Sequence, residues 1–174
     1  MVWDVKPLFF IKDIKMVIEI GSNIPASDYQ VKIEGAVGFY QTEDYFAEAK
    51  VVMFALPGAF TPTCTKKHLP GYLENHDALK QKGIDKIACL SVNDAHVMKA
   101  WGEELEIEGR VDLLADPHGT FSEKLGLLKD HGKMLGMRSR RSALIAQDGV
   151  VTHMFVEKKG GFELSTAEHI LSQL

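Results

Sequence analysis

The sequence predicts a single-domain α/β protein, with a central mixed β-sheet flanked by helices. Two continuous apolar runs, residues 50–56 and 86–92, are typical of strands buried on both faces. Two further apolar runs, residues 142–147 and 150–156, are joined by Gln147-Asp148-Gly149, which is a strong hairpin signal. A length of 174 residues suits one domain with one core.

The first half of the chain predicts strands separated by one long helix. Residues 16–20 suggest a short edge strand, and residues 50–56 a buried strand that ends at Pro57. Residues 62–82 are expected to form a helix that Pro70-Gly71 kinks. Gly83 is expected to end that helix as a C-terminal stop.

The middle of the chain alternates strand and helix again. After the strand at 86–92, Asn93-Asp94 is expected to cap a helix that runs through Glu106. A third strand is expected at 111–116, followed by a short helix at 120–125. The glycine- and charge-rich segment 127–137 predicts a loop.

The last third predicts an antiparallel hairpin and a closing helix. Ser165-x-x-Glu168 matches a capping box, which indicates a final helix that ends at Leu174. Early parallel strands followed by a late hairpin are the order of a thioredoxin-like fold. Hydrophobic periodicity indicates the α/β class, but it does not select this topology.

Composition limits the classes of function. The balance of 45% hydrophobic and 25% charged residues is that of a soluble globular protein, and no apolar run approaches the roughly 18 residues of a membrane span. A formal net charge of −4 disfavours nucleic acid as a partner. Two cysteines outside a CxxC pair indicate free thiols in a reducing compartment, which we expect to be the cytoplasm. No metal-binding or phosphate-binding pattern stands out, so we expect no cofactor.

Residues 1–15 are treated as an N-terminal extension to a domain of residues 16–174.

Cys64 lies at a position that favours its reactive form. The stretch PGAFTPTC follows a buried strand, with Pro62 at the expected first helical position and Thr61 as its expected cap. Cys64 then falls in the first helical turn, where unpaired backbone N–H groups and the helix dipole favour a thiolate. The thiolate is the nucleophilic form of cysteine. The alternative is a small apolar residue packed beneath the helix.

PGAFTPTC is followed by TKKHLPGY, ACLSVND, MKAWG, LLADP and SRRSALIAQDGVV. In this order and over residues 16–174, these segments resemble the type II, or peroxiredoxin-five-like, subfamily of the peroxiredoxins. The resemblance implies a thioredoxin-like fold and a thiol peroxidase that reduces hydrogen peroxide and organic hydroperoxides, with a role in antioxidant defence and redox homeostasis. It implies that Cys64 attacks the peroxide and becomes a sulfenic acid.

The same resemblance implies which residues surround Cys64. Breaking the O–O bond builds negative charge that fixed donors must stabilise. Thr61, three residues before the sulfur, is expected to contact both thiolate and peroxide, and Pro57 and Gly58 to form the wall of the substrate site. The family's catalytic arginine opens a strand, and that position falls on Arg141 here.

The resemblance also implies a separate reductant. Cys89 lies inside a predicted strand, where a buried core residue is the main interpretation and a resolving thiol the alternative. Some family members carry a resolving cysteine before the final helix, where this chain has Leu164. The sulfenic acid would therefore be reduced by glutathione with glutaredoxin, or by thioredoxin. A homodimer is expected from the family.

Two other functions remain open from the residues alone. His68 lies one turn after Cys64, so the pair could serve a cysteine hydrolase or thiol transferase. The resemblance places a histidine here too, without making it a general base, and tuning of the pocket is the role expected for it. A thioredoxin-like binding module or holdase without enzymatic activity is the other alternative.

Overall fold

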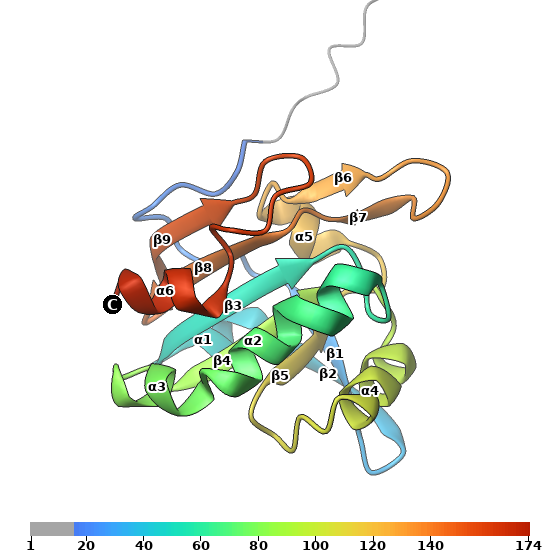
Figure 1. The fold of residues 1–174 in the computed structure, drawn as a ribbon, viewed down its shortest axis with the longest axis horizontal. Coiled ribbons are helices and arrows are strands. Elements are labelled where there is room, and N and C mark those ends of the chain that lie inside the picture. Colours follow the sequence, from blue (N-terminus) through green and yellow to red (C-terminus); the bar gives the residue numbers. More distant parts are fainter. Residues whose placement is uncertain (1–15) are drawn as a thin grey trace, which may run out of the picture.

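The computed structural model describes residues 16–174, so the expected extension at 1–15 lies outside the described residues. Figure 1 shows one sheet with helices on both faces. The strands of the main sheet are β1 (Asp28–Ile33), β2 (Ala36–Gln41), β3 (Lys50–Leu56), β4 (Lys86–Ser91), β5 (Asp112–Ala115), β8 (Ser142–Gln147) and β9 (Val150–Val156). Two short strands, β6 (Leu128–Asp130) and β7 (Met137–Ser139), form a separate hairpin. The helices are α1 (Thr42–Phe46), the π-helix η1 (Cys64–His68), α2 (Leu69–Glu74), α3 (His76–Gln81), α4 (Ala95–Glu104), α5 (Thr120–Lys124) and α6 (Ala167–Ser172).

The sheet is mixed, as predicted. Its order is β2-β1-β5-β4-β3-β8-β9, with β3, β4 and β5 parallel and the other pairs antiparallel. Strand β3 lies in the interior of the sheet, hydrogen-bonded to the central strand β4 on one side and to β8 on the other. The carboxyl end of β3 therefore opens onto the middle of one edge of the sheet, where ligand sites of α/β proteins form.

Strand β3 also separates two hydrophobic cores. Its side chains alternate between the faces, as the pleat requires. Val52, Phe54 and Leu56 pack against α2, α3, α4 and α6 on the face nearer the viewer in Figure 1. Met53 and its neighbours on the other face pack against α1 and α5. Burial on both faces explains why the sequence of β3 is continuously apolar.

The expected helix at 62–82 is divided into shorter pieces. The chain enters helix at Pro62, forms the π-helix at 64–68, and breaks again at Asn75 between α2 and α3. Pro70 has no N–H and its ring crowds the preceding turn, which accounts for a widened turn before it. Gly83, at φ +83°, ends the helix as predicted.

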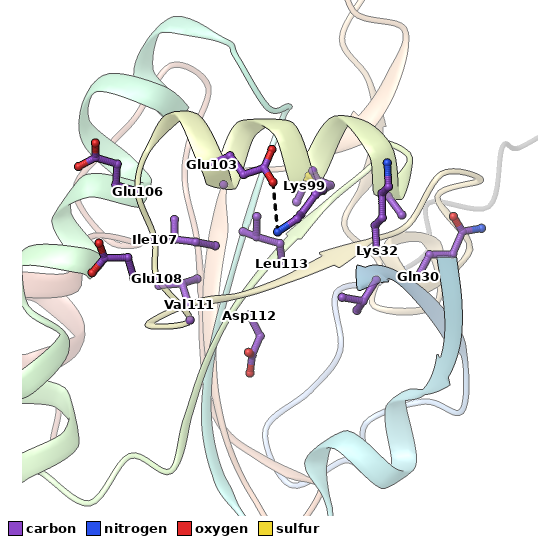
Figure 2. Close-up of a pocket in the computed structure, with 15 residues that line it drawn as sticks. Gln30, Lys32, Lys99, Glu103, Glu106, Ile107, Glu108, Val111, Asp112 and Leu113 are labelled. Carbon is purple, nitrogen blue, oxygen red and sulfur yellow. Dashed lines mark ion pairs between the residues drawn. The ribbon is translucent and has the colours of Figure 1, made fainter. Parts of the chain in front are cut away.

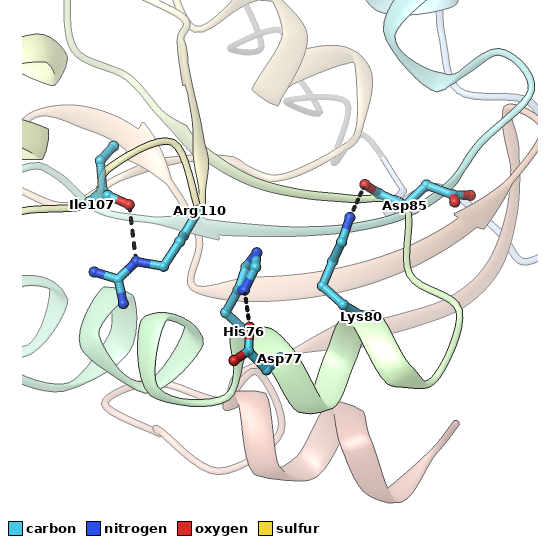
Figure 3. A network of polar contacts seen from close by, with 6 residues as sticks. All are labelled: His76, Asp77, Lys80, Asp85, Ile107 and Arg110. Atoms are coloured by element: carbon cyan, nitrogen blue, oxygen red, sulfur yellow. Dashed lines mark hydrogen bonds and ion pairs between the residues drawn. The ribbon is translucent and has the colours of Figure 1, made fainter.

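Local polar contacts stabilise the turns that follow α3 and α4 (Figure 3). Lys80 Nζ donates to the carbonyl of Asp85 at 2.7 Å, which joins α3 to the turn before β4. Arg110 Nε donates to the carbonyl of Ile107 at 3.2 Å in the loop after α4. These contacts are local and serve the connections between elements.

Two predicted features at the ends of the described chain are wrong. Residues 16–20 form no strand, and the sheet edge is instead the β1–β2 hairpin. Neither this hairpin nor α1 is among the elements predicted from the sequence. Thr166, not Ser165, caps α6: its Oγ1 accepts from the N–H of His169 at 3.1 Å. Ser165 is instead turned toward Glu157, to which its hydroxyl donates at 3.0 Å.

The remaining boundaries are close to the predictions. Asp94 caps α4 by accepting from two backbone N–H groups, and α4 ends at Glu104, two residues earlier than expected. The hairpin of β8 and β9 has the predicted bounds, with Asp148 and Gly149 both at positive φ. The segment expected as a loop at 127–137 contains β6 and the start of β7.

Candidate active site

Cys64 is placed by the end of β3 and the turn that follows it. Pro57 and Gly58 end the strand, and Cys64 opens the π-helix with its side chain 0% exposed. The carbonyl of Cys64 accepts from the N–H of Leu69, the five-residue spacing of a π-turn. Such turns occur mostly as single turns inside α-helices, and they are frequent at functional sites. The sulfur is therefore held inside the protein by a specific backbone conformation.

Arg141 reaches Cys64 from the neighbouring strand. Ala55 pairs with Ser142 in the β3–β8 ladder, so Arg141, just before β8, lies beside the end of β3. Its Nη2 donates to the Cys64 Sγ at 3.4 Å. The two residues are 77 positions apart in sequence, and the antiparallel register brings them together.

His68 holds the same guanidinium. Arg141 Nη1 lies 2.8 Å from His68 Nδ1, and because the guanidinium can only donate, Nδ1 accepts. The proton of the neutral ring is then on Nε2, which donates to the carbonyl of Ser165 at 3.0 Å. Burial and the charge of Arg141 lower the pKa of His68 to about 3. His68 is therefore neutral at pH 7, and both ring nitrogens are occupied.

An aromatic side chain closes one side of this pair. The Phe162 ring lies edge-on to His68 at 5.2 Å and 5.6 Å from the Arg141 guanidinium carbon, within the range of a cation–π contact. Neither Phe162 nor the positioning role of His68 follows from the sequence pattern. The signals for His68 are its spacing one turn after Cys64 and the family resemblance, which also places a histidine at this position.

Thr61 lies at the turn before Cys64, but it does not cap the helix as predicted. Its hydroxyl donates to the carbonyl of Gly58 at 2.8 Å. A threonine hydroxyl has one proton, so this bond uses its only donor hydrogen. The hydroxyl oxygen can still accept hydrogen bonds from other groups. The side chain is partly exposed, in contrast to the buried sulfur.

A second arginine lies against Pro57 and Gly58, the two residues expected to form the wall of the substrate site. Arg138 Nη1 donates to the carbonyl of Pro57 at 3.4 Å. A side chain at Gly58 would meet Arg138 Nη1 at 2.9 Å, so glycine allows this close approach. Asn93 fixes the next residue, since its Oδ1 accepts from the N–H of Ala59 at 3.0 Å.

Cys89 lies in the hydrophobic core. It pairs with Phe54 between β3 and β4 and is 0% exposed. Burial and the nearby charge of Cys64 raise the pKa of the Cys89 thiol well above its ordinary value. Both cysteines are free thiols. This geometry agrees with the interpretation of Cys89 as a core residue.

Two cavities lie in different places relative to this cluster. One, of about 550 Å³, is lined by α4 and the loop after it, by β5, and by the part of β1 that diverges from β5 (Figure 2). None of Cys64, Thr61 and Arg141 lines it. A second cavity, of about 430 Å³, includes Arg141 in its lining.

Over residues 16–174, no group of three or more His, Cys, Asp and Glu side chains is arranged to hold a metal ion. Within the same range, every helix is too short or too polar to cross a membrane.

Several known proteins that resemble this chain are peroxiredoxins. The Redoxin family matches residues 21–171. Peroxiredoxin-2E, chloroplastic, from Arabidopsis thaliana is 45% identical over 162 residues, which cover 90% of this chain and 69% of the relative. Peroxiredoxin-2B from the same plant is 44% identical over 153 residues, covering 81% of this chain and 93% of the relative.

A solved structure agrees with these relatives. The reduced Prx3 of Vibrio vulnificus in complex with H2O2 has a TM-score of 0.87 and 44% identity, over 90% of this chain and 99% of that chain. The mixed sheet flanked by helices is thus the thioredoxin-like fold that the resemblance implied. The chain belongs to the peroxiredoxin family of thiol peroxidases.

Proposed function

We propose that Cys64 is the peroxidatic nucleophile and that Arg141 activates it. The observation that supports this most directly is the 3.4 Å contact from Arg141 Nη2 to the buried Sγ. The guanidinium is always protonated, so it stabilises a thiolate there. The thiolate attacks one peroxide oxygen, the O–O bond breaks, and the other oxygen leaves with a proton as water or an alcohol. Cys64 becomes a sulfenic acid.

Thr61 and Arg141 then act as donors to the peroxide. The hydroxyl hydrogen that Thr61 donates to the Gly58 carbonyl would turn toward a bound peroxide. Pro57 and Gly58 would exclude water from the substrate as a wall of the pocket. The resulting site contains Cys64 as nucleophile, with Thr61 and Arg141 as its donors.

His68 argues against the hydrolase alternative. A general base must accept a proton, but Nδ1 already accepts from Arg141 and Nε2 donates to Ser165. The lowered pKa of His68, caused by burial and by Arg141, also disfavours protonation. A binding module without activity would have no need for a cation placed against a buried cysteine.

The subfamily, the substrates and the oligomeric state are proposed from the family resemblance. We assign the chain to the type II, peroxiredoxin-five-like subfamily, with hydrogen peroxide and organic hydroperoxides as substrates; the relatives are both peroxiredoxin-2 proteins, and the Vibrio structure binds H2O2. Residues 16–174 would form one peroxiredoxin domain with residues 1–15 as an extension. A homodimer in the cytoplasm is the expected form.

The reductant is proposed to be a separate thiol. The raised pKa of Cys89, caused first by burial, disfavours it as a resolving thiol. Glutathione with glutaredoxin, or thioredoxin, would then reduce the sulfenic acid.

The test is the second-order rate of Cys64 oxidation by hydrogen peroxide, followed by mass spectrometry. We expect Arg141→Ala to lower this rate at least about a hundredfold, the scale of losing one transition-state donor. Arg110→Ala is the matched control, since Arg110 contacts only nearby carbonyls after α4. A wild-type rate no higher than that of a small free thiol, unchanged in Arg141→Ala, would refute the proposal.

A further inference from the structure

A cavity of about 550 Å³ lies between α4 and the sheet, outside the candidate active site (Figure 2). It opens where β1 and β5 diverge, since these two strands share only the pair Gln30 and Ala115. One face of α4 covers it, with residues at helical spacings of three and four, which are Ala95, Met98, Lys99, Gly102 and Glu103. This space, the α4 cavity, has a volume that suits a small molecule.

Apolar side chains form the inner wall of the α4 cavity. Met98 and Val111 belong to the hydrophobic core beneath α4, and Leu113 packs against that core. Gly102 lets α4 approach the sheet, because a side chain there would meet Leu113 Cδ1 at 2.7 Å and Ile107 Cδ1 at 2.9 Å. The cavity is therefore continuous with the core, and an apolar group that enters it is removed from water, which favours binding.

Lys32 brings an unpaired positive charge to this apolar space. It lies on β1 and is half-buried, and Figure 2 shows its side chain reaching toward α4. Its ammonium group has no hydrogen bond or ion pair with any of residues 16–174. Lys99, by contrast, is paired with Glu103 at 3.3 Å. A half-buried ammonium group is best satisfied by an anionic oxygen, so Lys32 indicates a ligand with a carboxylate.

The acidic residues of the α4 cavity limit the ligand to a single negative charge. Asp112 already accepts from the Tyr45 hydroxyl at 2.6 Å. Glu106 and Glu108 form no ion pair within residues 16–174, and Figure 2 shows them at the end of the cavity opposite to Lys32. A second anionic group at that end would be repelled. An amine at that end is also disfavoured, because both glutamates are exposed and an ion pair in water contributes little.

We propose that the α4 cavity binds an apolar monocarboxylic acid, with its carboxylate at Lys32 and its hydrocarbon body beneath α4. A medium-chain fatty acid has this chemistry. Burial of the apolar body supplies the affinity, and the ion pair with Lys32 fixes the orientation. The inference does not depend on the proposed function, since none of Cys64, Thr61 and Arg141 lines this cavity.

The test uses molecules that have the same chain and different charged ends. Binding of decanoate and of decylamine to the full-length protein is measured by isothermal titration calorimetry, with each ligand below its critical micelle concentration. We expect decanoate to bind at one site and at least about fivefold more tightly than decylamine, the scale of one partly exposed ion pair. Decanedioate, which adds a carboxylate at the far end of the chain, should bind more weakly than decanoate.

Variants of Lys32 locate the carboxylate. Lys32→Met keeps the length of the side chain and removes its charge, so decanoate should bind about fivefold more weakly. Lys32→Glu should reverse the preference, so that decylamine binds more tightly than decanoate. Lys82→Met is the matched control, because Lys82 lies exposed at the end of α3, and it should leave both affinities unchanged. Far-UV circular dichroism shows whether each variant is folded.

Failure of decanoate to bind, or tighter binding of decylamine to the wild type, would overturn the proposal. These two outcomes need no variant, so the proposal stays testable even if a Lys32 variant does not fold. Equal affinities of wild type and Lys32→Met for decanoate would overturn the placement of the carboxylate. Equal affinities for decanoate and decanedioate would overturn the limit that Glu106 and Glu108 set. The rate of Cys64 oxidation by hydrogen peroxide tests the proposed function separately.

Discussion

Arg141 donates to His68 at 2.8 Å with one nitrogen and to Cys64 at 3.4 Å with another. The two bonds share one planar guanidinium, so the position of His68 fixes the angle at which Arg141 meets the sulfur. His68 in turn is fixed by the Ser165 carbonyl. The electrostatic environment of Cys64 therefore depends on a residue that takes no part in proton transfer.

This relationship predicts the effect of removing His68. In His68→Ala, Arg141 loses its support, and we expect the rate of Cys64 oxidation to fall about tenfold, less than for Arg141→Ala. His68→Asn should recover part of the loss, since its amide oxygen can accept from Arg141. Both rates are measured by mass spectrometry with hydrogen peroxide as oxidant.

The double variant separates positioning from a direct role. If His68 acts through Arg141, His68→Ala should have no further effect in an Arg141→Ala background, because the two residues then form one unit. Fully additive losses would show that His68 affects Cys64 by another route.

Thr61 provides a second test of the site. Thr61→Val keeps the shape of the side chain but removes the hydroxyl that now donates to Gly58. We expect the rate of Cys64 oxidation to fall about a hundredfold, as for other lost transition-state donors. Thr61→Ser retains the hydroxyl and should stay within about tenfold of wild type. Equal rates for the two variants would assign Thr61 a packing role only.

Cys89 is predicted to be dispensable for turnover. Its thiol is buried beside Phe54 in the parallel ladder, and burial is the main cause of its raised pKa. Cys89→Ala should therefore turn over peroxide at nearly the wild-type rate with an external thiol, and lower the free energy of unfolding by about 1 kcal/mol for the lost packing. Cys64→Ser should show no turnover. An oxidised wild-type protein that contains a Cys64–Cys89 disulfide would contradict this prediction.

The central strands could be predicted because their environment is uniform. Strand β3 is apolar at nearly every position since both of its faces are covered, and the β8–β9 hairpin is specified by its Asp148-Gly149 turn. The β1–β2 hairpin is the least evident part of the sheet, because only β1 alternates polar and apolar residues; in β2 the adjacent Phe39 and Tyr40 are both exposed, so the alternation is lost there. The cap of α6 was misplaced by one residue because Ser165 and Thr166 are both good caps, and Glu157 decides between them.

Only those residues of the candidate site that lie together in one short segment of the sequence could be predicted from local patterns. Thr61, Pro62 and Cys64 lie in a single turn, so local rules place them near one another. Arg141 was located only through the family resemblance, since its approach depends on the register between β3 and β8. Phe162 has no local signal at all, because its position is set by the loop that Glu157 ties to Ser165.

The buried His68 predicts a specific dependence of stability on pH. Burial, followed by the charge of Arg141, lowers its pKa from 6.5 to about 3 in the folded protein. Between these values the unfolded chain binds a proton at this residue and the folded protein does not, so acid favours unfolding. The free energy of unfolding should therefore fall by about 1.4 kcal/mol per pH unit from this one group as the pH drops from 6.5 toward 3.

Urea unfolding at pH 7, 6 and 5 measures this slope. His68→Gln removes the titrating group, so its stability, although lower at pH 7 for lack of the histidine's contacts, should decline less steeply with acid than that of the wild type. His96→Gln is the matched control, since His96 lies exposed on α4 and should keep the wild-type slope. The Glu157 carboxylate lowers the free energy of unfolding only at more acidic pH. Burial tends to raise the pKa of Glu157, but hydrogen bonds from Ser165 and Glu163 outweigh burial and lower it. Its contribution to stability is therefore lost as the pH falls below the ordinary range of glutamate. Parallel slopes for wild type and His68→Gln between pH 7 and 5 would mean that His68 protonates in the folded protein, and the neutral acceptor assigned to Arg141 would then be wrong.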